Sequence, residues 1–147
     1  MIHYKTPEEI EIMRESCQLA AEVLVMIDPY VKPGVTTDRL NEICHEYIVS
    51  KGAIPSPLNY RGFPKSICSS VNEEICHGIP SDRKLRNGDI VNLDITTYFK
   101  GFHGDTSRTF FVGSPRKKAK KLVEVCKETL QRGIEVVKPG ARLGDIG

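Results

Sequence analysis

The sequence has 147 residues, of which 39% are hydrophobic and 27% are charged, and its net charge is +2. A chain of this length and composition is typical of one globular domain with a buried core, and not of a disordered or membrane-spanning protein. So small a net charge gives no reason to expect DNA as a partner.

The five cysteines are irregularly spaced and form no C-x-x-C pair, which argues against a zinc ribbon and against a disulfide framework. Reduced thiols in a cytoplasmic protein are the better interpretation. The N-terminal segment is charged and contains no apolar run of the kind found in signal peptides. The longest apolar stretch, 19–27, is interrupted by Glu22 and is too short to span a membrane.

The first predicted element is a helix over residues 7–30. Thr6 is suited to cap it, Pro7 occupies its first position, and Glu9 stands three residues after the cap, which completes a capping box. Apolar side chains then recur every three or four residues, as on one face of a helix, at Ile10, Met13, Cys17, Ala20, Leu24 and Ile27. We expect this stripe to pack in the core.

A second helix is predicted after the Val-Lys-Pro-Gly turn at 31–34, which ends the first helix. The Thr-Thr-Asp run at 36–38 offers caps for it, and Gly52 is suited to its end. Its apolar face consists of Leu40, Ile43, Cys44, Tyr47 and Ile48. The proline-containing segment 53–65 is predicted to be a structured loop.

Strands are predicted at 66–71, 89–98 and 105–112, with a turn at Lys100-Gly101. A third helix is predicted to begin at Ser114-Pro115 and to extend to about Val137, with a buried stripe of Leu122, Val125, Cys126, Thr129 and Ile134. Its first turns carry a basic cluster of Arg116, Lys117, Lys118, Lys120 and Lys121. A solvated helix face is the simplest interpretation of this cluster, and a surface that binds an acidic partner is the alternative.

Residues 137–140 repeat the Val-Lys-Pro-Gly sequence of residues 31–34. Each copy follows a long predicted helix and precedes a helix start, at 37–40 and at 143–146. Matching positions in this helix–turn–helix order favour an internally duplicated unit whose second copy is cut off at Gly147. The alternative is that Lys-Pro-Gly is simply a common way to end a helix.

The most informative segment is 92–108, which predicts a β-hairpin. Placing Phe99 and Lys100 at its tip puts Asp94 directly opposite Asp105. Opposed residues of an antiparallel pair have Cβ atoms about 4.5–5.5 Å apart, so two ionised carboxylates there repel each other. A divalent metal ion bound between the two carboxylates would offset their repulsion. Oxygen ligands of this kind suit manganese, iron, cobalt or zinc. An ordinary turn or bulge around Asp105 is the alternative.

His77 lies in the segment Cys-His-Gly-Ile-Pro at 76–80, which predicts a rigid turn after a short strand. A histidine held there is suited to donate a hydrogen bond to a substrate or to move a proton. A structural or merely exposed histidine is the alternative, as it is for His3 and His103. His45 lies on a predicted helix between apolar positions, and we expect no chemistry of it.

Several segments together resemble type I methionine aminopeptidases. They are residues 60–68 (Tyr-Arg-Gly-Phe-Pro-Lys-Ser-Ile-Cys), 70–80 (Ser-Val-Asn-Glu-Glu-Ile-Cys-His-Gly-Ile-Pro) and 101–107 (Gly-Phe-His-Gly-Asp-Thr-Ser), with 5–10 (Lys-Thr-Pro-Glu-Glu-Ile) in support. The resemblance extends over essentially all 147 residues. It implies an α/β (α+β) fold, the N-terminal half of a pita-bread fold, in which helices cover an antiparallel β-sheet.

By position, the resemblance implies that Asp94 binds one divalent metal ion and that Asp105 bridges two. It implies that His77 contacts the substrate and assists proton movement. Phe63 stands where the family often has tyrosine, and Pro57 stands where some members have cysteine. The residues in the place of the walls of the methionine pocket are Tyr60, Phe63 and Cys68.

The resemblance also implies what this chain lacks. In the family, a histidine and two glutamates complete the metal shell, a second substrate histidine lies between them, and all of them come from the second half. That half is expected to begin near residue 115 and to be largely missing, so residues 1–147 would form a single incomplete catalytic domain. Two ligands alone hold a divalent ion poorly, because catalytic sites usually have three or more protein ligands.

The activity that the resemblance implies is removal of the initiator methionine from new proteins, by hydrolysis assisted by two divalent metal ions (cobalt, manganese, iron or zinc). The implied partners are the N-terminal methionine of peptides and nascent chains, with contact to the ribosome, in the cytoplasm. The alternative is a catalytically inactive half-length protein of the same fold that binds metal or acts as an interaction scaffold.

Overall fold

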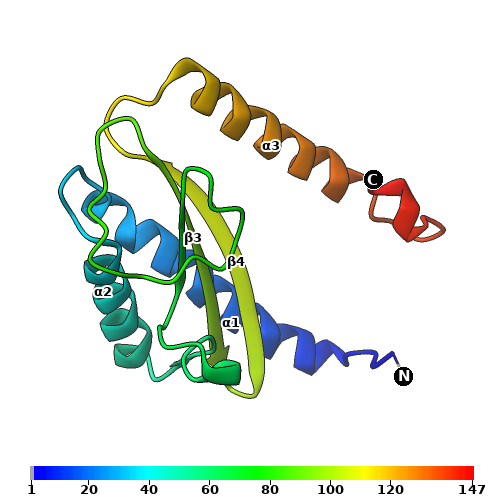
Figure 1. Cartoon of the computed structure of the whole chain (residues 1–147). Helices are drawn as coiled ribbons and strands as arrows, with labels where there is room; N and C mark the ends of the chain where they lie inside the picture. Colours follow the sequence, from blue (N-terminus) through cyan, green and yellow to red (C-terminus); the bar gives the residue numbers. More distant parts are fainter. Residues whose placement is uncertain (1) are drawn as a thin grey trace. The chain divides into compact units, whose positions relative to one another are not determined.

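The computed structural model describes residues 2–147 and divides into two compact units (Figure 1). The first unit ends at Ser114, and the second consists of Pro115–Gly147. The pseudo-symmetry of a second half that begins near residue 115 stays a prediction. Within the part of the chain described, no helix is both long and apolar enough to cross a membrane, and all five cysteines are free.

A four-stranded antiparallel sheet forms the centre of the first unit. Strands β3 (Ile90–Phe99) and β4 (Phe102–Phe111) pair along their whole length as a hairpin. The short strands β1 (Ile54–Pro55) and β2 (Cys68–Val71) both pair with β3. This arrangement of antiparallel strands and helices confirms the predicted fold class, and β1 lies in a segment for which only a loop was predicted.

Helix α1 (Pro7–Ile27) has the predicted capping box at its start. The Glu9 amide donates to Thr6 Oγ1 at 3.2 Å, and the Thr6 amide donates to Glu9 Oε2 at 2.8 Å. The helix ends three residues earlier than predicted and continues as a 3-10 turn, η1 (Asp28–Tyr30). Pro29 accounts for this change, because it has no amide hydrogen for the next bond of an α-helix.

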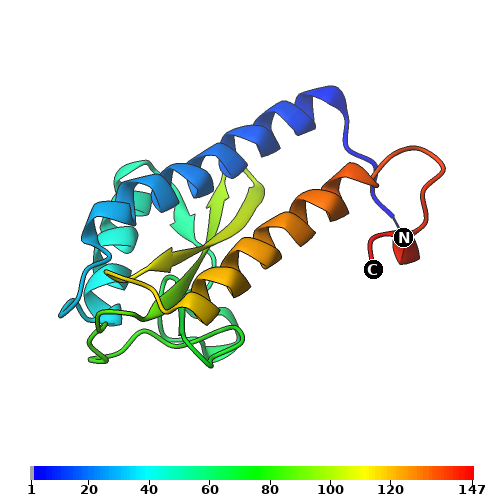
Figure 2. The ribbon, with the colours of Figure 1, turned by 90° about the horizontal axis from the view of Figure 1, so that it is seen from above.

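Only the second half of the stripe predicted for α1 is buried. Ala20, Leu24 and Ile27 lie in the core, whereas Ile10 is 44% exposed, Met13 is 37% exposed and Cys17 is exposed. The prediction was therefore wrong for these three residues. Ile10 and Met13 lie on the first turns of the helix, which Figure 2 shows projecting past the hairpin. Cys17 is exposed for another reason, because the neighbouring Ser16 occupies the buried face of the helix at that level.

Helix α2 (Thr37–Ser50) begins at the predicted cap and has the predicted apolar face. Thr36 Oγ1 accepts the Arg39 amide at 3.1 Å, and Leu40, Cys44 and Ile48 are fully buried. Burial raises the pKa of the Cys44 thiol to about 12, as expected for a cysteine that serves as a core residue.

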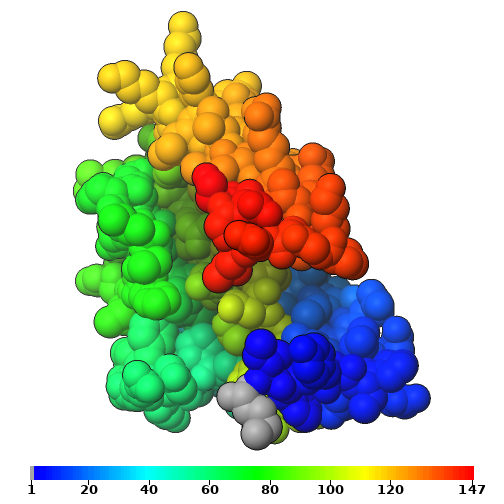
Figure 3. Space-filling model, turned by 90° about the vertical axis from the view of Figure 1, so that its right-hand side faces the viewer, coloured from blue at the N-terminus to red at the C-terminus, as the bar shows by residue number. Residues whose placement is uncertain are grey.

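Helices and loops lie on opposite sides of the hairpin. Figures 1 and 2 show α1 along one face of β3 and β4, while the segments that follow β1 and β2 lie toward the other face. The space-filling view shows olive and yellow atoms of the hairpin between the blue atoms of α1 and the green atoms of these loops (Figure 3). One face of the sheet is thus core, and the other is available to build a site.

The second unit contains α3 (Lys117–Glu135) and a short 3-10 turn, η3 (Leu143–Asp145). No residue of α3 is buried, so the prediction of a buried stripe was wrong. The stripe is nevertheless patterned like the core face of α1. When the two Val-Lys-Pro-Gly turns are aligned, the buried positions Ser16, Leu19, Ala20, Val23, Leu24 and Ile27 correspond to Leu122, Val125, Cys126, Thr129, Leu130 and Gly133.

The two Val-Lys-Pro-Gly turns also have the same local geometry. Gly34 and Gly140 adopt φ angles of 91° and 90°. In each copy the residue after the glycine donates its amide to the lysine carbonyl, at 3.2 Å in the first and 3.0 Å in the second. In each copy the valine amide also donates to the carbonyl three residues before it, at 3.1 Å. The matching geometry favours the internal duplication predicted from the sequence.

Candidate active site

The hairpin turns at Lys100 and Gly101, one residue later than the predicted tip. Both residues have positive φ angles, 50° and 89°, which is the geometry of the tight type I′ turn that suits the twist of a hairpin. Phe99 therefore pairs with Phe102. The Lys100 ammonium forms an ion pair with Glu15 of α1 at 2.5 Å.

The predicted register was wrong as a consequence. Asp94 lies opposite Ser107, and Asp105 lies opposite Thr96, so the two aspartates are diagonal and not direct neighbours. The error amounts to two residues on the partner strand, and side chains alternate between the faces of a sheet with a period of two. Asp94 and Asp105 consequently still lie on the same face.

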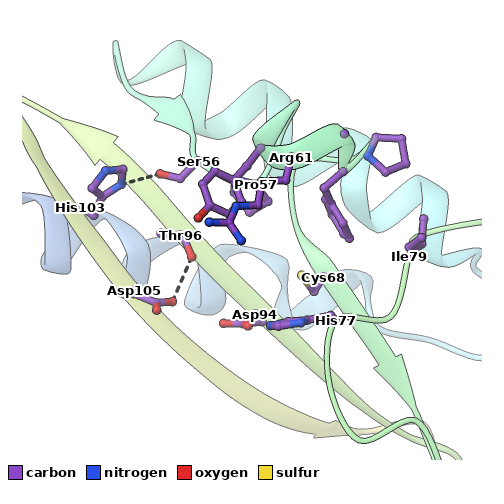
Figure 4. A pocket seen from close by; sticks show the side chains of 14 residues that line it. Ser56, Pro57, Arg61, Cys68, His77, Ile79, Asp94, Thr96, His103 and Asp105 are labelled. Atoms are coloured by element: carbon purple, nitrogen blue, oxygen red, sulfur yellow. Dashed lines mark hydrogen bonds between the residues drawn. The ribbon is translucent and has the colours of Figure 1, made fainter.

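Alternation along β3 directs this face away from the core. Leu93 and Ile95 are fully buried. Asp94, which lies between them, and Thr96, which follows Ile95, are half-buried. The Thr96 hydroxyl donates to Asp105 Oδ1 at 3.0 Å and so holds the second carboxylate over the strand that carries the first (Figure 4). Diagonal neighbours are about 7–8 Å apart, and the two carboxylates are close enough for the charge of Asp105 to raise the pKa of Asp94, after the larger effect of burial.

The surroundings of Asp94 disfavour its charged form. Burial raises the pKa of this carboxyl above its usual range, the like charge of Asp105 raises it further, and His77 acts in the opposite direction. Cys68 lies directly opposite Asp94 on β2, and burial together with the nearby carboxylates raises the pKa of its thiol to about 11. The thiol is therefore neutral near pH 7, and the carboxylate pair is the feature that calls for a cation.

The loop that follows β2 brings His77 to the sheet face that carries Asp94 and Asp105. Its imidazole lies beside the Asp94 carboxylate (Figure 4). Its backbone has a left-handed φ of 54°, which is unusual for a residue with a side chain. The next residue, Gly78, is hydrogen-bonded back to β2 through Ser69 and Ser70. The predicted turn is thus a tight one, and it presents the histidine at the edge of the carboxylate face.

All six predicted site residues line one cavity of about 670 Å³. Asp94 and Asp105 come from the hairpin, and Cys68 from β2. His77 comes from the loop after β2, and Tyr60 and Phe63 come from the segment before it. Further lining residues are Ser56, Pro57, Arg61, Ile79, Thr96 and His103. A cavity with apolar walls and a few convergent polar groups is the usual form of a small-molecule or peptide site.

Sequence reasoning missed some of these residues and left others without a role. Thr96 orients Asp105, and the alternation of β3 could have indicated that it shares a face with Asp94. His103 has a partner, because its Nδ1 lies 2.9 Å from Ser56 Oγ. Arg61, with a φ of 50°, lies on the loop side of the cavity, and no local sequence signal marks it. His45 is hydrogen-bonded to Ser66 Oγ at 2.8 Å, in line with a structural residue.

The donor set fits part of a metal shell. Two carboxylates on one face, one of them with a raised pKa, are suited to hard or borderline divalent cations. Across residues 2–147, however, no three histidine, cysteine, aspartate or glutamate side chains converge on one metal position. A complete shell therefore needs ligands in addition to those that these residues provide.

Comparison with known proteins also points to metal-dependent peptidases. The model of metallopeptidase family M24 matches residues 11–147. The methionine aminopeptidase of Rickettsia prowazekii is 53% identical over 146 residues, which are 99% of this chain and 56% of that protein. Methionine aminopeptidase of Escherichia coli is also 53% identical, over 99% of this chain and 56% of its own length. The chain therefore spans little more than half the length of these relatives.

Solved structures agree in fold. The crystal structure of the Rickettsia prowazekii methionine aminopeptidase superimposes with a TM-score of 0.98 over 99% of this chain and 59% of its own. The methionine aminopeptidase of Thermotoga maritima, at 36% identity, gives a TM-score of 0.95. The prolidase of Pyrococcus horikoshii, at 22% identity and a TM-score of 0.81, shares the fold. The chain is thus a member of the metallopeptidase family M24, and it corresponds to the first part of the methionine aminopeptidases.

Proposed function

We propose that this chain supplies the first half of the active site of a methionyl aminopeptidase, which removes the N-terminal methionine from peptides and nascent proteins. The observation that carries the proposal is the shared cavity. Its surface joins two carboxylates on one sheet face, one histidine and a group of apolar walls. Relatives at 53% identity are named methionine aminopeptidases, which supports this activity over others of the same fold.

In this proposal Asp94 and Asp105 are the residues of this chain that would hold divalent ions, with Asp105 in the role of the bridging ligand. The ions, when bound, polarise the carbonyl of the substrate and make water a stronger acid. Thr96 keeps the Asp105 carboxylate in place through its 3.0 Å hydrogen bond. Burial, and then the like charge of Asp105, raise the pKa of Asp94, and bound cations would favour its charged form, so metal binding and ionisation of this residue favour each other.

His77 is assigned to the substrate and not to the metal. Its position at the edge of the cavity allows it to hydrogen-bond the peptide at the bond to be cleaved and to exchange a proton there. The methionine side chain is assigned to the walls formed by Tyr60, Phe63 and Cys68. Aromatic rings and a neutral thiol favour a thioether, because sulfur makes favourable contacts with ring edges.

The proposed activity also implies a cellular compartment and partners. Five free cysteines are typical of a reducing compartment, which supports the cytoplasm. Nascent chains would be the substrates there. Contact with the ribosome is supported only by the basic cluster at the start of α3, which is exposed.

The test joins residues 1–147 of this chain to the part of the Escherichia coli methionine aminopeptidase that follows the region of similarity. The hybrid is expected to release methionine from a Met-Ala-Ser peptide in the presence of manganese or cobalt. The chain by itself is expected to show no robust turnover, because its metal shell is incomplete. A folded hybrid without activity would contradict the proposal.

The metal assignment is tested in the same hybrid. Asp105→Asn should lower turnover by at least roughly a hundredfold, which is the upper end of the loss seen when a mere outer-shell partner is removed. Asp82→Asn is the matched control, because Asp82 is an exposed aspartate outside the cavity. Full activity of the Asp105 variant would overturn the bridging role.

A further inference from the structure

The backbone of His77 raises the question of what holds it in place. A left-handed φ of 54° is costly for a residue with a Cβ and persists only where the surroundings impose it. The loop around it supplies little support, since residues 72–77 are exposed and Ile75 at its tip is 95% exposed. The support must therefore come from where the loop rejoins the sheet.

The chain rejoins the sheet at the residue directly after His77. The Ser69 amide donates to the Gly78 carbonyl at 2.8 Å, and the Gly78 amide donates to Ser70 Oγ at 3.1 Å. The approach is so close that a Cβ at Gly78 would lie 2.1 Å from the Ser69 carbonyl oxygen. Only glycine permits it.

The two serines of this contact use their side chains differently. Ser69 and Ser70 are 2% and 5% exposed and are adjacent on β2, so their side chains lie on opposite faces of the sheet. Ser70 shares a face with Cys68 and accepts the Gly78 amide. Ser69 Oγ is buried without any hydrogen-bond partner among the residues that the structure describes.

The remaining side-chain contacts of the loop are made earlier in the chain. Glu74 Oε2 accepts the Val71 amide at 2.8 Å, and its other oxygen pairs with Arg83 at 3.0 Å. The Glu74 carboxylate also lies close to Gly78, since a Cβ there would be 3.0 Å from Oε2, but its hydrogen bonds go to Val71 and Arg83. The Ser70 hydroxyl is the side-chain group that accepts a hydrogen bond from the backbone next to His77.

We propose that Ser70 is a positioning residue for His77. By holding the Gly78 amide, its hydroxyl keeps His77 in the left-handed conformation and its imidazole beside Asp94. The task of the imidazole rests on the proposed function, whereas its placement by Ser70 is a property of this chain and is measurable without turnover. Neither serine was predicted to take part in the site.

The experiment is nuclear magnetic resonance of the labelled full chain with Ser70→Ala and, as the matched control, Ser69→Ala. In Ser70→Ala the Gly78 amide should exchange with solvent about fivefold faster, the factor expected for loss of one hydrogen bond. The His77 ring should also lose its nuclear Overhauser contacts to Cys68 and Asp94. Ser69→Ala should leave both signals as in the wild type.

Two further variants keep the test decisive if Ser70→Ala does not fold. Ser70→Thr retains the hydroxyl and should restore the wild-type ring contacts. Ser70→Cys keeps a side chain of similar size with a weak acceptor, and it should show the same losses as Ser70→Ala. Unchanged ring contacts in both Ser70→Ala and Ser70→Cys, or equal losses in Ser69→Ala, would overturn the proposal.

Added manganese separates this inference from the proposed function. It is added to the hybrid enzyme, in which the metal shell is complete, while the ring contacts of the Ser70 variants are measured in the chain itself. If manganese gives the hybrid no turnover while the Ser70 variants still lose the ring contacts, the metal assignment fails and the positioning role stands. If the hybrid turns over with manganese and the variants keep the contacts, the positioning role fails and the metal assignment stands.

Discussion

Gly104 of β4 lies directly against the Ser16 carbonyl of α1. A Cβ at Gly104 would be 2.2 Å from the Ser16 carbonyl oxygen and 2.6 Å from the Cys17 amide nitrogen. The same helical residue is bonded to the hairpin, since Ser16 Oγ donates to the Phe102 carbonyl at 3.1 Å and Thr97 Oγ1 donates to the Ser16 carbonyl at 3.0 Å. The residue before the proposed bridging aspartate is thus where helix and hairpin touch.

Gly104→Ala is therefore expected to lower the free energy of unfolding by about 3 kcal/mol or more, because two backbones must move apart. The movement would also shift Asp105 and weaken manganese binding. Urea unfolding and a manganese titration measure the two effects. Gly144→Ala, where nothing lies within 4 Å of the added methyl, is the control and should change neither.

Asp94→Asn should make the metal-free chain more stable at neutral pH. The folded-state pKa of Asp94 is raised, so its contribution to stability is present in full below the unfolded pKa and is lost as pH rises through the folded pKa. Asparagine has no such loss. Urea unfolding in the presence of a chelator, from about pH 4 to about pH 8, measures the free energy of unfolding across the range of carboxyl titration. The free energy of the variant should increase relative to that of the wild type as pH rises. A constant difference between the two proteins would contradict the assignment, and a constant difference is what the control Asp82→Asn should show.

Metal binding should weaken on acidification sooner than for an ordinary carboxylate pair. A proton competes with the metal for Asp94, and the raised pKa lets it compete at higher pH. Calorimetric titration of the hybrid enzyme, in which the metal shell is complete, with manganese at a series of pH values measures this competition. The release of protons on binding near the raised pKa is the expected signature, and binding that is independent of pH would count against Asp94 as a ligand.

The hairpin turn gives a prediction about stability alone. Gly101 has a φ of 89°, so Gly101→Ala should cost about 1–2 kcal/mol in the free energy of unfolding. Gly101→Asn should cost less, because asparagine tolerates positive φ better than alanine. Thermal unfolding of the two variants checks the order. An alanine variant as stable as the asparagine variant would contradict the assigned turn.

Ser69→Ala should leave the chain as stable as the wild type or stabilise it by about 1 kcal/mol. The Ser69 hydroxyl is buried without a partner, and removal of such a group spares its desolvation cost. Urea unfolding measures the difference. A loss of stability would show that the hydroxyl makes a favourable contact.

Local signals carried most of the correct predictions about the fold. The capping box at Thr6 and the cap at Thr36 depend on residues within one turn of each other, and both formed as predicted. The register of the hairpin also depended on a local signal, the Lys100-Gly101 pair. That signal was recognised as a turn and then displaced by one residue in the alignment of the strands.

Burial was harder to predict because it depends on partners outside the pattern. Met13 lies on the predicted stripe of α1 but beyond the sheet that buries its later residues. The stripe of α3 is exposed along its whole length. A periodic sequence specifies which face of a helix can be covered, whereas the extent of the covering surface is a tertiary property.

Sequence reasoning named the main residues of the candidate site but not the residues that support them. Asp94, Asp105 and His77, which the hairpin and turn patterns singled out and to which the resemblance gave roles, line one cavity; those roles stay predictions. Thr96 and Ser70 hold two of these groups through hydrogen bonds to a carboxylate and to a backbone amide. Alternation along β3 could have placed Thr96 on the face of Asp94, whereas the partner of Ser70 lies across a loop and is a tertiary contact that the local sequence does not specify.

The twin turns at 31–34 and 137–140 have a further consequence. The Gly34 amide donates to the Leu85 carbonyl at 2.7 Å, a contact from a distant part of the sequence, whereas Gly140 has no backbone partner of this kind among the residues described. The second turn nevertheless has the shape of the first. The shape of the turn is therefore set by its own four residues and the hydrogen bonds within it, and the contact with Leu85 is an addition to the first copy that the shape does not require.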